Sequence, residues 1–545
     1  MPARALRNLE RLKTHVDDGA AEAKLALMRA LGQQDLRTAG QVRRLHEVLC
    51  FLRAYPGDER VAARAARLLD RFERRKDLVR HRDALADSGI AGTVIRYRFF
   101  WSTALWLARR WPRQLVLERD DAEAAARLGA ALPLLAARAG AEWLAEAKAP
   151  VFDALDRLRG RSGDAAWLTA RIAALPGDGF TREAFADGLD LPWVLEPGRD
   201  TPSRSRAHFP GVPHAFRFAP VSGRPDLRAA LGTPPTGVRL LRRREAAAMI
   251  ELARAAMVTR ARDLMAFEYA EPRDVRLVDD GDGLGFAFVG VAGERRSILP
   301  ALFGYLMLRN GVPVGYGQVD VLGPRAAVSF NVFDTFRGAE AALLMARLMS
   351  ATRHVFGATS FSLEPYQLGQ GNDEAIETGA WWFYHKLGFR PLATEARRVM
   401  RGETARRRAN PRHRSSSRTL RSLARHHQFF DLGPVPGRGL APAETVLARA
   451  SAWLARRGGG TLAEDAADDA ARRVTGLRSL AGYTRDERIA WRRWAPVIAS
   501  WPNITRWSTG ERRALVGVVR AKGGAPELEY LLRVAAHPRL SKAFG

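Results

Sequence analysis

The sequence predicts an α/β protein in which a central part with strands and helices lies between two all-helical regions. Three observations support this fold class. From Leu6 to about Leu189, apolar residues recur at every third or fourth position, the spacing of an amphipathic helix. After Gly237, short apolar runs alternate with tight turns, and from Ala441 the helical spacing returns. Because 545 residues are too many for one compact core, we expect two or three domains.

Residues 1–195 are predicted to form an all-helical domain. The run from Leu45 to Leu52 shows the helical spacing, and breaks such as Pro56-Gly57-Asp58 separate successive helices. At a usual length of about 11–12 residues each, six to eight helices fit this domain. Residues 196–237 are rich in proline, glycine, serine and arginine, which predicts an interdomain linker.

A third segment, residues 238–400, is predicted to alternate strands with helices. Two turns, Asp279–Gly283 and Asn310-Gly311, are typical of hairpins, because their residues readily adopt positive φ. A helical segment is expected over Arg244–Met265. The expected strands of this first half are 238–241, 275–278, 286–291, 304–308 and 314–321.

Two strand-and-helix units follow in the same segment. A strand over Ala326–Phe336 breaks at Arg337-Gly338 into a helix over Ala341–Phe356. A second strand, Thr359–Leu363, leads through a loop to a helix over Ala375–Leu387. A basic linker over residues 401–440 and a helical C-terminal region over residues 441–545 complete the predicted organisation.

The two units carry the most informative pattern of the chain. Val332–Arg337 ends a strand directly before a helix, and Tyr384 precedes Gly388-Phe389 at the end of the next helix. These motifs resemble the acyl-CoA-binding half of the GNAT superfamily of N-acetyltransferases, and the resemblance extends over about 238–392. It implies a mixed, mainly antiparallel sheet flanked by helices, and transfer of an acyl group from acetyl-CoA or another acyl-CoA to a primary amine.

The resemblance also implies a binding mode for the cosubstrate. A strand that splays from its neighbour leaves backbone groups free to bond the pantetheine amides, and the following helix N-terminus directs N–H groups at the pyrophosphate. The family's turn is Gln/Arg-x-x-Gly-x-Gly/Ala, which places Arg337 on its first position and Ala342 on its last. The residues expected to bind CoA are Val332, Phe333, Arg337, Gly338, Ala339, Glu340, Ala341, Ala342 and Asn372.

Glu340 departs from this pattern, because the family has glycine at that position. A carboxylate beside a pyrophosphate costs electrostatic energy unless it points away or pairs with Arg337. The sequence therefore leaves two alternatives: Glu340 lies outside the phosphate site, or the pocket does not take CoA.

The expected catalytic residues are Tyr384, from the resemblance, and Glu364, from its position. Tyr384 occupies the position whose hydroxyl protonates the departing thiolate, although a packed aromatic helix face would give the same pattern. Removal of the amine proton requires a base, for which Glu364 ranks first by its place at a strand end, before Asp334 and Glu268. Two other functions remain open: a noncatalytic module that binds an anionic partner, and an aminoacyl-tRNA-dependent transferase on the same fold.

The charge of the chain favours anionic partners. The formal net charge is +28, and Arg397–Arg425 contains eleven arginines against one acid, Glu403. This segment is predicted to be a solvated linker that could contact a nucleic acid or an acidic membrane surface. The longest aromatic and apolar run, Phe99–Ala108, is shorter than the roughly 20 residues that span a bilayer, and favours a buried helix.

Cysteine and histidine usage argues against a metal site. The single cysteine, Cys50, excludes cysteine-cluster sites and intramolecular disulfides. His413 and the pair His426-His427 have no acidic residue at a ligand spacing beside them. Because the chain also begins without a recognisable secretory signal, a cytoplasmic location is expected.

Overall fold

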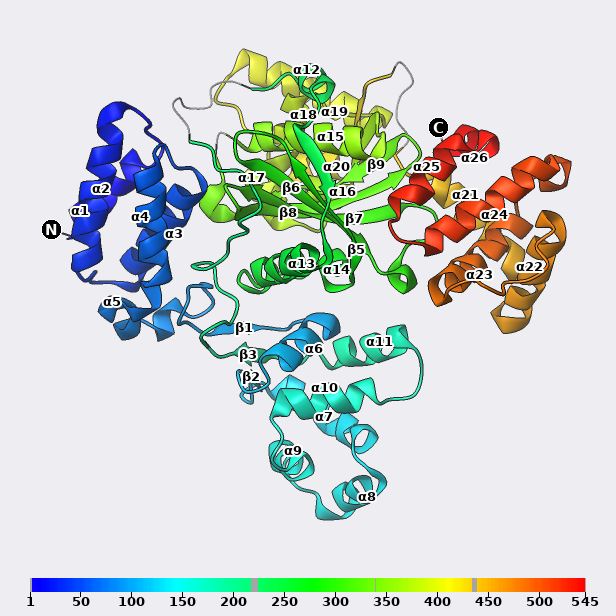
Figure 1. Ribbon diagram of the computed structural model, residues 1–545, viewed down its shortest axis with the longest axis horizontal. Coiled ribbons are helices and arrows are strands. Elements are labelled where there is room, and N and C mark those ends of the chain that lie inside the picture. The colour runs from blue at the N-terminus through cyan, green and yellow to red at the C-terminus, as the bar shows by residue number, and fades with distance from the viewer. Residues whose placement is uncertain (1, 217–223, 339, 434–438, 545) are drawn as a thin grey trace. The chain divides into compact units, whose positions relative to one another are not determined.

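The computed structural model describes residues 2–216, 224–338, 340–433 and 439–544, and it divides into two compact units (Figure 1). The first unit comprises the described residues within 1–220, 248–268 and 309–313. The second comprises those within 221–247, 269–308 and 314–545. The number of units fits the expectation of two or three domains, but each unit is assembled from more than one stretch of sequence.

The first unit is mainly helical, as the spacing of its apolar residues predicts. Figure 1 shows α1 to α5 packed together as a bundle. Helix starts coincide with capping residues: the Thr38 side chain accepts the Gln41 N–H, and Asp58 accepts those of Arg60 and Val61. The helices are α1 (Pro2–Leu12), α2 (Asp18–Gln33), α3 (Ala39–Ala54), α4 (Glu59–Asp70), α5 (Lys76–Arg80), α6 (Trp101–Arg110), α7 (Ala122–Leu135), α8 (Arg138–Ala147), α9 (Val151–Arg159), α10 (Asp164–Ala173) and α11 (Gly179–Leu189), with 3-10 turns η1 (Phe72–Arg74) and η2 (Asp83–Leu85).

The prediction that residues 1–195 are all-helical is wrong in one respect. Three short strands, β1 (Ile95–Tyr97), β2 (Leu115–Leu117) and β3 (Trp193–Leu195), form an antiparallel sheet in the order β1-β3-β2. Each strand has three residues, which is too short to show the alternation that identifies a strand in a sequence. The strands that pair are also far apart in the chain, so no hairpin turn in the sequence indicates the pairing.

The predicted linker, residues 196–237, is partly packed structure. Ser205 is fully buried and lies against α3, where its carbonyl accepts a hydrogen bond from Arg53 at 2.8 Å and its hydroxyl bonds His46 at 2.8 Å. A short helix, α12 (Leu227–Gly232), follows in the second unit. Hydrogen bonds to buried polar side chains hold the segment in place. Because it shows no regular pattern of apolar residues, its composition resembles that of a linker.

The second unit is built on a ten-stranded mixed sheet, which confirms the expected α/β class with a mainly antiparallel sheet and helical flanks. The strand order is β12-β13-β11-β9-β8-β7-β6-β5-β4, and β10 also pairs with β8. The pair β9–β11 is parallel. The strands are β4 (Gly237–Leu240), β5 (Ala270–Asp279), β6 (Leu284–Val291), β7 (Ala301–Arg309), β8 (Val312–Leu322), β9 (Arg325–Val328), β10 (Asn331–Val332), β11 (Ser360–Leu363), β12 (Arg390–Pro391) and β13 (Gln428–Asp431).

Helices cover this sheet, and α15 lies on one of its faces. The Phe356 ring at the end of α15 packs on Phe288 of β6 and Phe303 of β7, with ring centroids 5.1 and 4.5 Å away. Helix α13 begins in the second unit and continues into the first, to which α14 belongs. The helices from α13 to α20 are α13 (Arg243–Val258), α14 (Met265–Glu268), α15 (Ala341–Phe356), α16 (Pro365–Leu368), α17 (Asp373–Thr378), α18 (Ala380–Leu387), α19 (Thr394–Ala409) and α20 (Ser417–Ala424).

The prediction of a basic linker over residues 401–440 is wrong. Most of its described part forms the end of α19, then α20 and β13, and β13 lies in the sheet between β11 and β12. The arginines are largely exposed, while Leu420, Leu423 and the carboxylate of Glu403 are buried. The arginine density therefore concealed an amphipathic helix and a strand. Residues 434–438 lie outside the described part of the chain.

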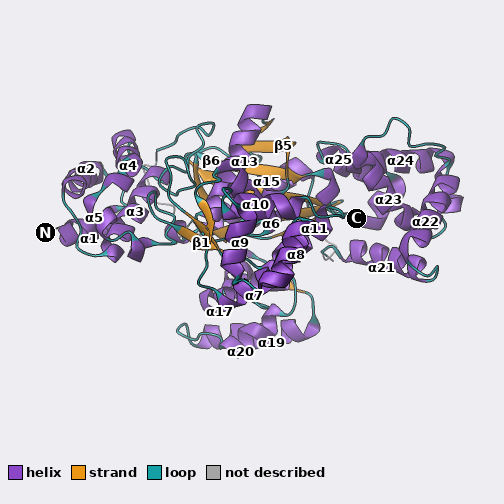
Figure 2. Cartoon of the chain, turned by 90° about the horizontal axis from the view of Figure 1, so that it is seen from below, coloured by secondary structure: helices purple, strands orange, loops and turns teal. Residues whose placement is uncertain are grey.

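The C-terminal region is helical, as predicted. Figure 2 shows α21 to α25 as helices joined by loops, without a strand. It belongs to the same compact unit as the sheet, because Trp494, Lys522 and Tyr530 donate hydrogen bonds to the carbonyls of Ile298, Pro300 and Leu299 directly before β7. Its helices are α21 (Ala441–Ala455), α22 (Gly460–Thr475), α23 (Arg485–Ala499), α24 (Thr509–Gly523), α25 (Leu528–Ala536) and α26 (Pro538–Phe544). No described helix is long and apolar enough to cross a membrane.

Candidate functional site

The sheet of the second unit opens between β10 and β11. At the base, Arg325, Ala326 and Ala327 of β9 pair in parallel with residues 360–362 of β11. Further along, Asn331 and Val332 of β10 pair with β8, and none of the described pairings joins β10 to β11. The predicted separation holds only in that β10 has no described pairing with β11, because three of the four residues of β11 pair with β9 and β11 ends at Leu363. The other strand ends at Val332 instead of Phe336, where a 3-10 turn (Asp334–Phe336) follows.

A cavity of about 280 Å³, which we call the cleft, occupies this opening. Three polar groups converge in it: the Phe330 N–H donates to Oε1 of Gln367 at 3.1 Å, and the Tyr384 hydroxyl donates to the same oxygen at 3.4 Å. The Phe330 amide thus bonds a side chain in the cleft rather than a neighbouring strand. The cleft is lined by Phe330, Asn331, Val332, Arg337, Ala341, Gln367, Asn372, Glu374, Ala375, Thr378, Ala380, Phe383 and Tyr384.

Tyr384 lies where the sequence places it, on α18 with its ring lining the cleft. Its side chain is buried, and burial raises the pKa of the Tyr384 hydroxyl well above its ordinary value. The phenol therefore keeps its proton at neutral pH and can donate it to a group in the cleft.

A second cavity of about 500 Å³, which we call the basic cavity, adjoins the cleft, because Thr378 and Phe383 line both. Burial, together with repulsion by Arg407, Arg224 and Arg414, lowers the pKa of Lys386. These four cations come from three separate parts of the chain, and the described lining residues include no carboxylate. The basic cavity is lined by Arg224, Gly338, Ala342, Thr378, Gly379, Trp382, Phe383, Lys386, Leu387, Arg407 and Arg414. It is therefore suited to an anionic group.

The turn before α15 borders both cavities. Gly338 and Ala342 line the basic cavity, and Ala341, the first residue of α15, lines the cleft. The first N–H groups of a helix have no partner inside it and attract anions. Ala339, which was expected to bind CoA as well, lies outside the described residues. The arrangement places a helix N-terminus beside a group of cations.

Glu340, the residue that departs from the family's pattern, is partly buried and lines neither cavity. Arg337 forms ion pairs with Asp334, at 2.8 Å, and with Glu374, and its Nε donates to the carbonyl of Val332 at 3.3 Å. The Glu340 side chain therefore obstructs neither cavity.

Two further residues expected to bind CoA have structural roles. Phe333 is buried, stacks on Tyr316, and donates its N–H to the Val314 carbonyl at 2.9 Å, so it continues the pairing with β8 and does not line the cleft. Asn372 lines the cleft, but its Oδ1 accepts the Ala375 N–H at 3.1 Å and thereby caps α17. Val332 lines the cleft as expected.

The expected bases differ in position. Glu364 is exposed directly before α16 and does not line the cleft, although Gln367 of the same short helix does. Asp334 is exposed and paired with Arg337. Glu268 belongs to the first unit, so it is not part of this site as described.

Sequence reasoning missed one carboxyl group in this sheet, Asp320 of β8. Burial, and to a smaller extent the nearby Glu364 and Glu527, raise the pKa of Asp320 to about 7, while a hydrogen bond from Gln318 opposes the change. Asp320 faces Ala327, the last residue of β9 that pairs with β11 before the strands separate. Asp320 lies between two valines, and an acid at such a position in an alternating strand is expected to face solvent. Nothing in the sequence therefore indicated that its pKa is raised.

No family model, curated protein or solved structure matches this chain. Within the described residues, no group of three or more histidine, cysteine, aspartate or glutamate side chains could hold a metal ion.

Proposed function

We propose that the second unit is an acyl-CoA-dependent N-acyltransferase of the GNAT type, which moves an acetyl or another acyl group to a primary amine. The observation that carries the proposal is the opening between β10 and β11, where a hydrogen-bonding cleft continues into a cavity lined by four cations. An acyl-CoA has the matching order of parts: a thioester, an arm with two amides, and a phosphate-rich end.

Each part of such a molecule has a counterpart. In the cleft, the unpaired edge of β10 and the amide group of Gln367 offer hydrogen bonds to the arm, while Phe330 and Phe383 provide apolar contact. In the basic cavity, Arg224, Lys386 and the N-terminus of α15 offer positive charge to the phosphates. The size of each cavity is of the order that small ligands occupy.

The reaction requires one proton donor and one proton acceptor. As the amine nitrogen bonds the thioester carbon and the carbon–sulfur bond breaks, Tyr384 gives its proton to the departing thiolate. A carboxylate takes the proton that the amine loses. Neither candidate lines the cleft. Asp320 lies opposite Ala327, where β9 stops pairing with β11, and its pKa is raised to about 7, close to the value that suits a base at neutral pH. Glu364 is the alternative expected from the sequence.

Thermal denaturation with acetyl-CoA, a long-chain acyl-CoA and free CoA tests this proposal. A ligand at 100 times its Kd stabilises the native state by about 2.7 kcal/mol, so binding raises the melting temperature measurably. A larger shift with one acyl-CoA would identify the preferred acyl chain. The absence of any shift would remove acyl-CoA and favour a noncatalytic module or an aminoacyl-tRNA-dependent transferase.

A further inference from the structure

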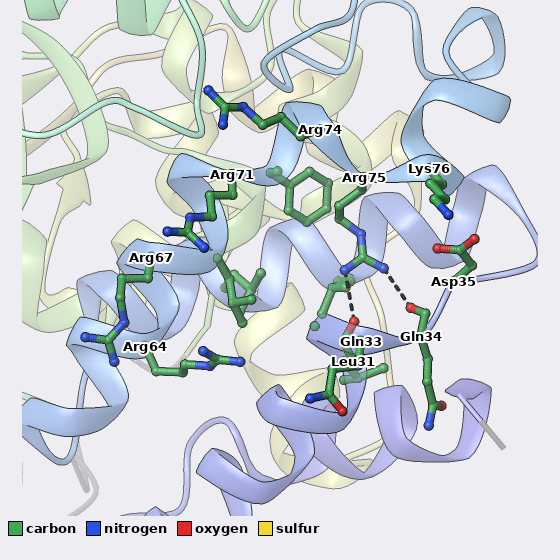
Figure 3. Close-up of a pocket in the computed structure, with 15 residues that line it drawn as sticks. Leu31, Gln33, Gln34, Asp35, Arg64, Arg67, Arg71, Arg74, Arg75 and Lys76 are labelled. Atoms are coloured by element: carbon green, nitrogen blue, oxygen red, sulfur yellow. Dashed lines mark hydrogen bonds between the residues drawn. The ribbon is translucent and has the colours of Figure 1, made fainter.

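The first unit contains a separate cavity of about 790 Å³, which we call the N-terminal cavity. It lies between the end of α2 and the segment formed by α4, η1 and the start of α5 (Figure 3). Its lining consists of Leu31, Gly32, Gln33, Gln34, Asp35, Leu45, Leu49, Arg64, Arg67, Leu68, Arg71, Phe72, Arg74, Arg75 and Lys76. Six of these side chains are cationic and one is a carboxylate, so positive charge dominates.

Within the part of the chain that the structure describes, four of the arginines have no carboxylate partner. Arg75 is held in place by an ion pair with Asp77 at 2.7 Å. It also donates hydrogen bonds to the carbonyls of Leu31 and Gln34, which Figure 3 shows as dashed lines. The carboxylate of Asp35 lies 3.6 Å from the guanidinium group of Arg80, an arginine that does not line the cavity. Among the described residues, the arginine side chains of the lining that form no ion pair or hydrogen bond are those of Arg64, Arg67, Arg71 and Arg74, and the Lys76 side chain forms none either.

Other arginines of this unit are neutralised. Arg119 pairs with both Asp156 and Asp164, at 2.7 and 3.2 Å, and Arg98 pairs with Asp121. The chain can therefore supply carboxylates to its arginines, but the described residues supply none to the four in the N-terminal cavity. Like charges held close together repel, and an anionic ligand would relieve this repulsion.

The sequence explains how the arginines share one wall. Positions 64, 67, 71 and 74 are three or four residues apart, so they follow one face of α4 and continue into η1. The opposite face of α4 packs into the bundle through Val61, Ala65 and Leu69. In Figure 3 the side chains of Arg64, Arg67 and Arg71 follow one another along one side of the cavity.

Arg64 shows an unused bonding capacity inside the N-terminal cavity. Its Nε is buried without a hydrogen-bond partner among the described residues, so the outer guanidinium nitrogens are the ones left to bond a ligand. Gly32 of α2 leaves the space that this group occupies, because a Cβ at Gly32 would lie 3.3 Å from Nη2 of Arg64 and 3.1 Å from Leu68. The end of α2 therefore accommodates an arginine rather than closing the cavity.

We propose that the N-terminal cavity binds a ligand with clustered phosphate groups. Guanidinium groups match phosphate oxygens with paired hydrogen bonds, and four of them along one wall suit two or more adjacent phosphates. The site is concave, which favours a compact group of phosphates over a flat anionic surface. Phe72 is only 1% exposed, so no aromatic face is available to stack on a base, and the site recognises phosphates alone. This site belongs to the first unit and does not depend on the proposed acyltransferase.

Isothermal titration calorimetry of the full chain with inorganic tripolyphosphate tests the proposal. We expect binding that weakens by a factor of about ten or more in Arg67→Gln/Arg71→Gln, because two charge-assisted contacts are lost. Both side chains are exposed, so the variant should fold. The matched control is Arg113→Gln/Arg161→Gln, which removes two exposed arginines of the same unit outside the cavity and should bind as the wild type does.

Two further arms identify the source of the phosphates and exclude the other basic site. ATP that binds no more tightly than tripolyphosphate would support recognition of phosphates alone. Arg407→Gln/Arg414→Gln weakens the anion site proposed for the basic cavity, and in this background Arg67→Gln/Arg71→Gln should still weaken tripolyphosphate binding by a factor of about ten or more. The proposal is overturned if tripolyphosphate does not bind, or if Arg67→Gln/Arg71→Gln binds it as the wild type does. Binding of a single-stranded oligoribonucleotide without binding of tripolyphosphate would also overturn it, in favour of an extended nucleic-acid surface.

Discussion

Glu268 should make the first unit less stable as the pH rises toward neutrality. Glu268 is 9% exposed, its Oε2 accepts a hydrogen bond from Ser102, and its Oε1 is buried without a hydrogen-bond partner among the described residues. Burial, and to a smaller extent the nearby Asp263, Glu183 and Asp187, raise the pKa of Glu268 from 4.5 to about 7, while the hydrogen bond from Ser102 opposes the change. The folded chain therefore favours the protonated, neutral form of this carboxyl group.

The sign and magnitude of the effect follow from this difference in pKa. Below pH 4.5 the group is protonated in both states, and its neutral form fits the folded chain without penalty. Between 4.5 and about 7 the unfolded chain loses its proton first, so the free energy of unfolding falls as the pH rises. A pKa difference of about 2.5 at about 1.36 kcal/mol for each pKa unit corresponds to a loss of about 3 kcal/mol.

Glu268→Gln removes the titrating proton and keeps the shape of the side chain. Urea unfolding followed by tryptophan fluorescence, at half-unit steps from pH 4.5 to 8, should show that the wild type loses about 3 kcal/mol more stability across this range than the variant does. Glu146→Gln, which removes an exposed carboxylate of the same unit, should retain the wild-type profile. Parallel pH profiles for the wild type and Glu268→Gln would refute the reasoning.

Three predictions concern the proposed active site. Tyr384→Phe should lower kcat by about 10² or more and leave the Kd for CoA unchanged, because the ring stays and only the proton donor is lost; equal turnover would exclude the role. Asp320→Asn should abolish the fall of kcat/KM below pH of about 7, while Glu364→Gln should keep it; the opposite result would make Glu364 the base. Glu340→Gly should change the calorimetric Kd for CoA by less than about threefold, because its carboxylate lies outside both cavities, and a large gain in affinity would show that Glu340 blocks the site.

The sequence predicted the elements whose signals are local. Helix α15 has the bounds expected from its apolar spacing and ends at Gly357, which has φ of 78° and so favours glycine. The turn Asn310-Gly311 has positive φ at both residues, 47° and 75°, as its hairpin signal predicts. Elements that depend on distant partners were missed: β13 joins the sheet only through β11 and β12, and the arginine-rich sequence before it hid the buried face of α20.

The same distinction applies to the candidate site. Tyr384 was found because its motif is contiguous, and the structure places it in the cleft. Arg407 and Arg414 of the basic cavity lie in the segment expected to contact an anionic partner. Arg224 and Lys386 were not expected there, because they join the other two only through the packing of distant segments. The pKa of Asp320 likewise depends on burial by residues far away in the sequence, which spacing alone does not reveal.

The central claim is that one acyl-CoA molecule extends through the cleft and the basic cavity. Thr378 is exposed and lines both, so Thr378→Trp should fill their junction without disturbing the core. Calorimetric titration with acetyl-CoA is predicted to show binding by the wild type and a loss of affinity of about tenfold or more in Thr378→Trp, with unchanged thermal stability of the free protein. No binding by the wild type, or equal binding by both proteins, would contradict the claim.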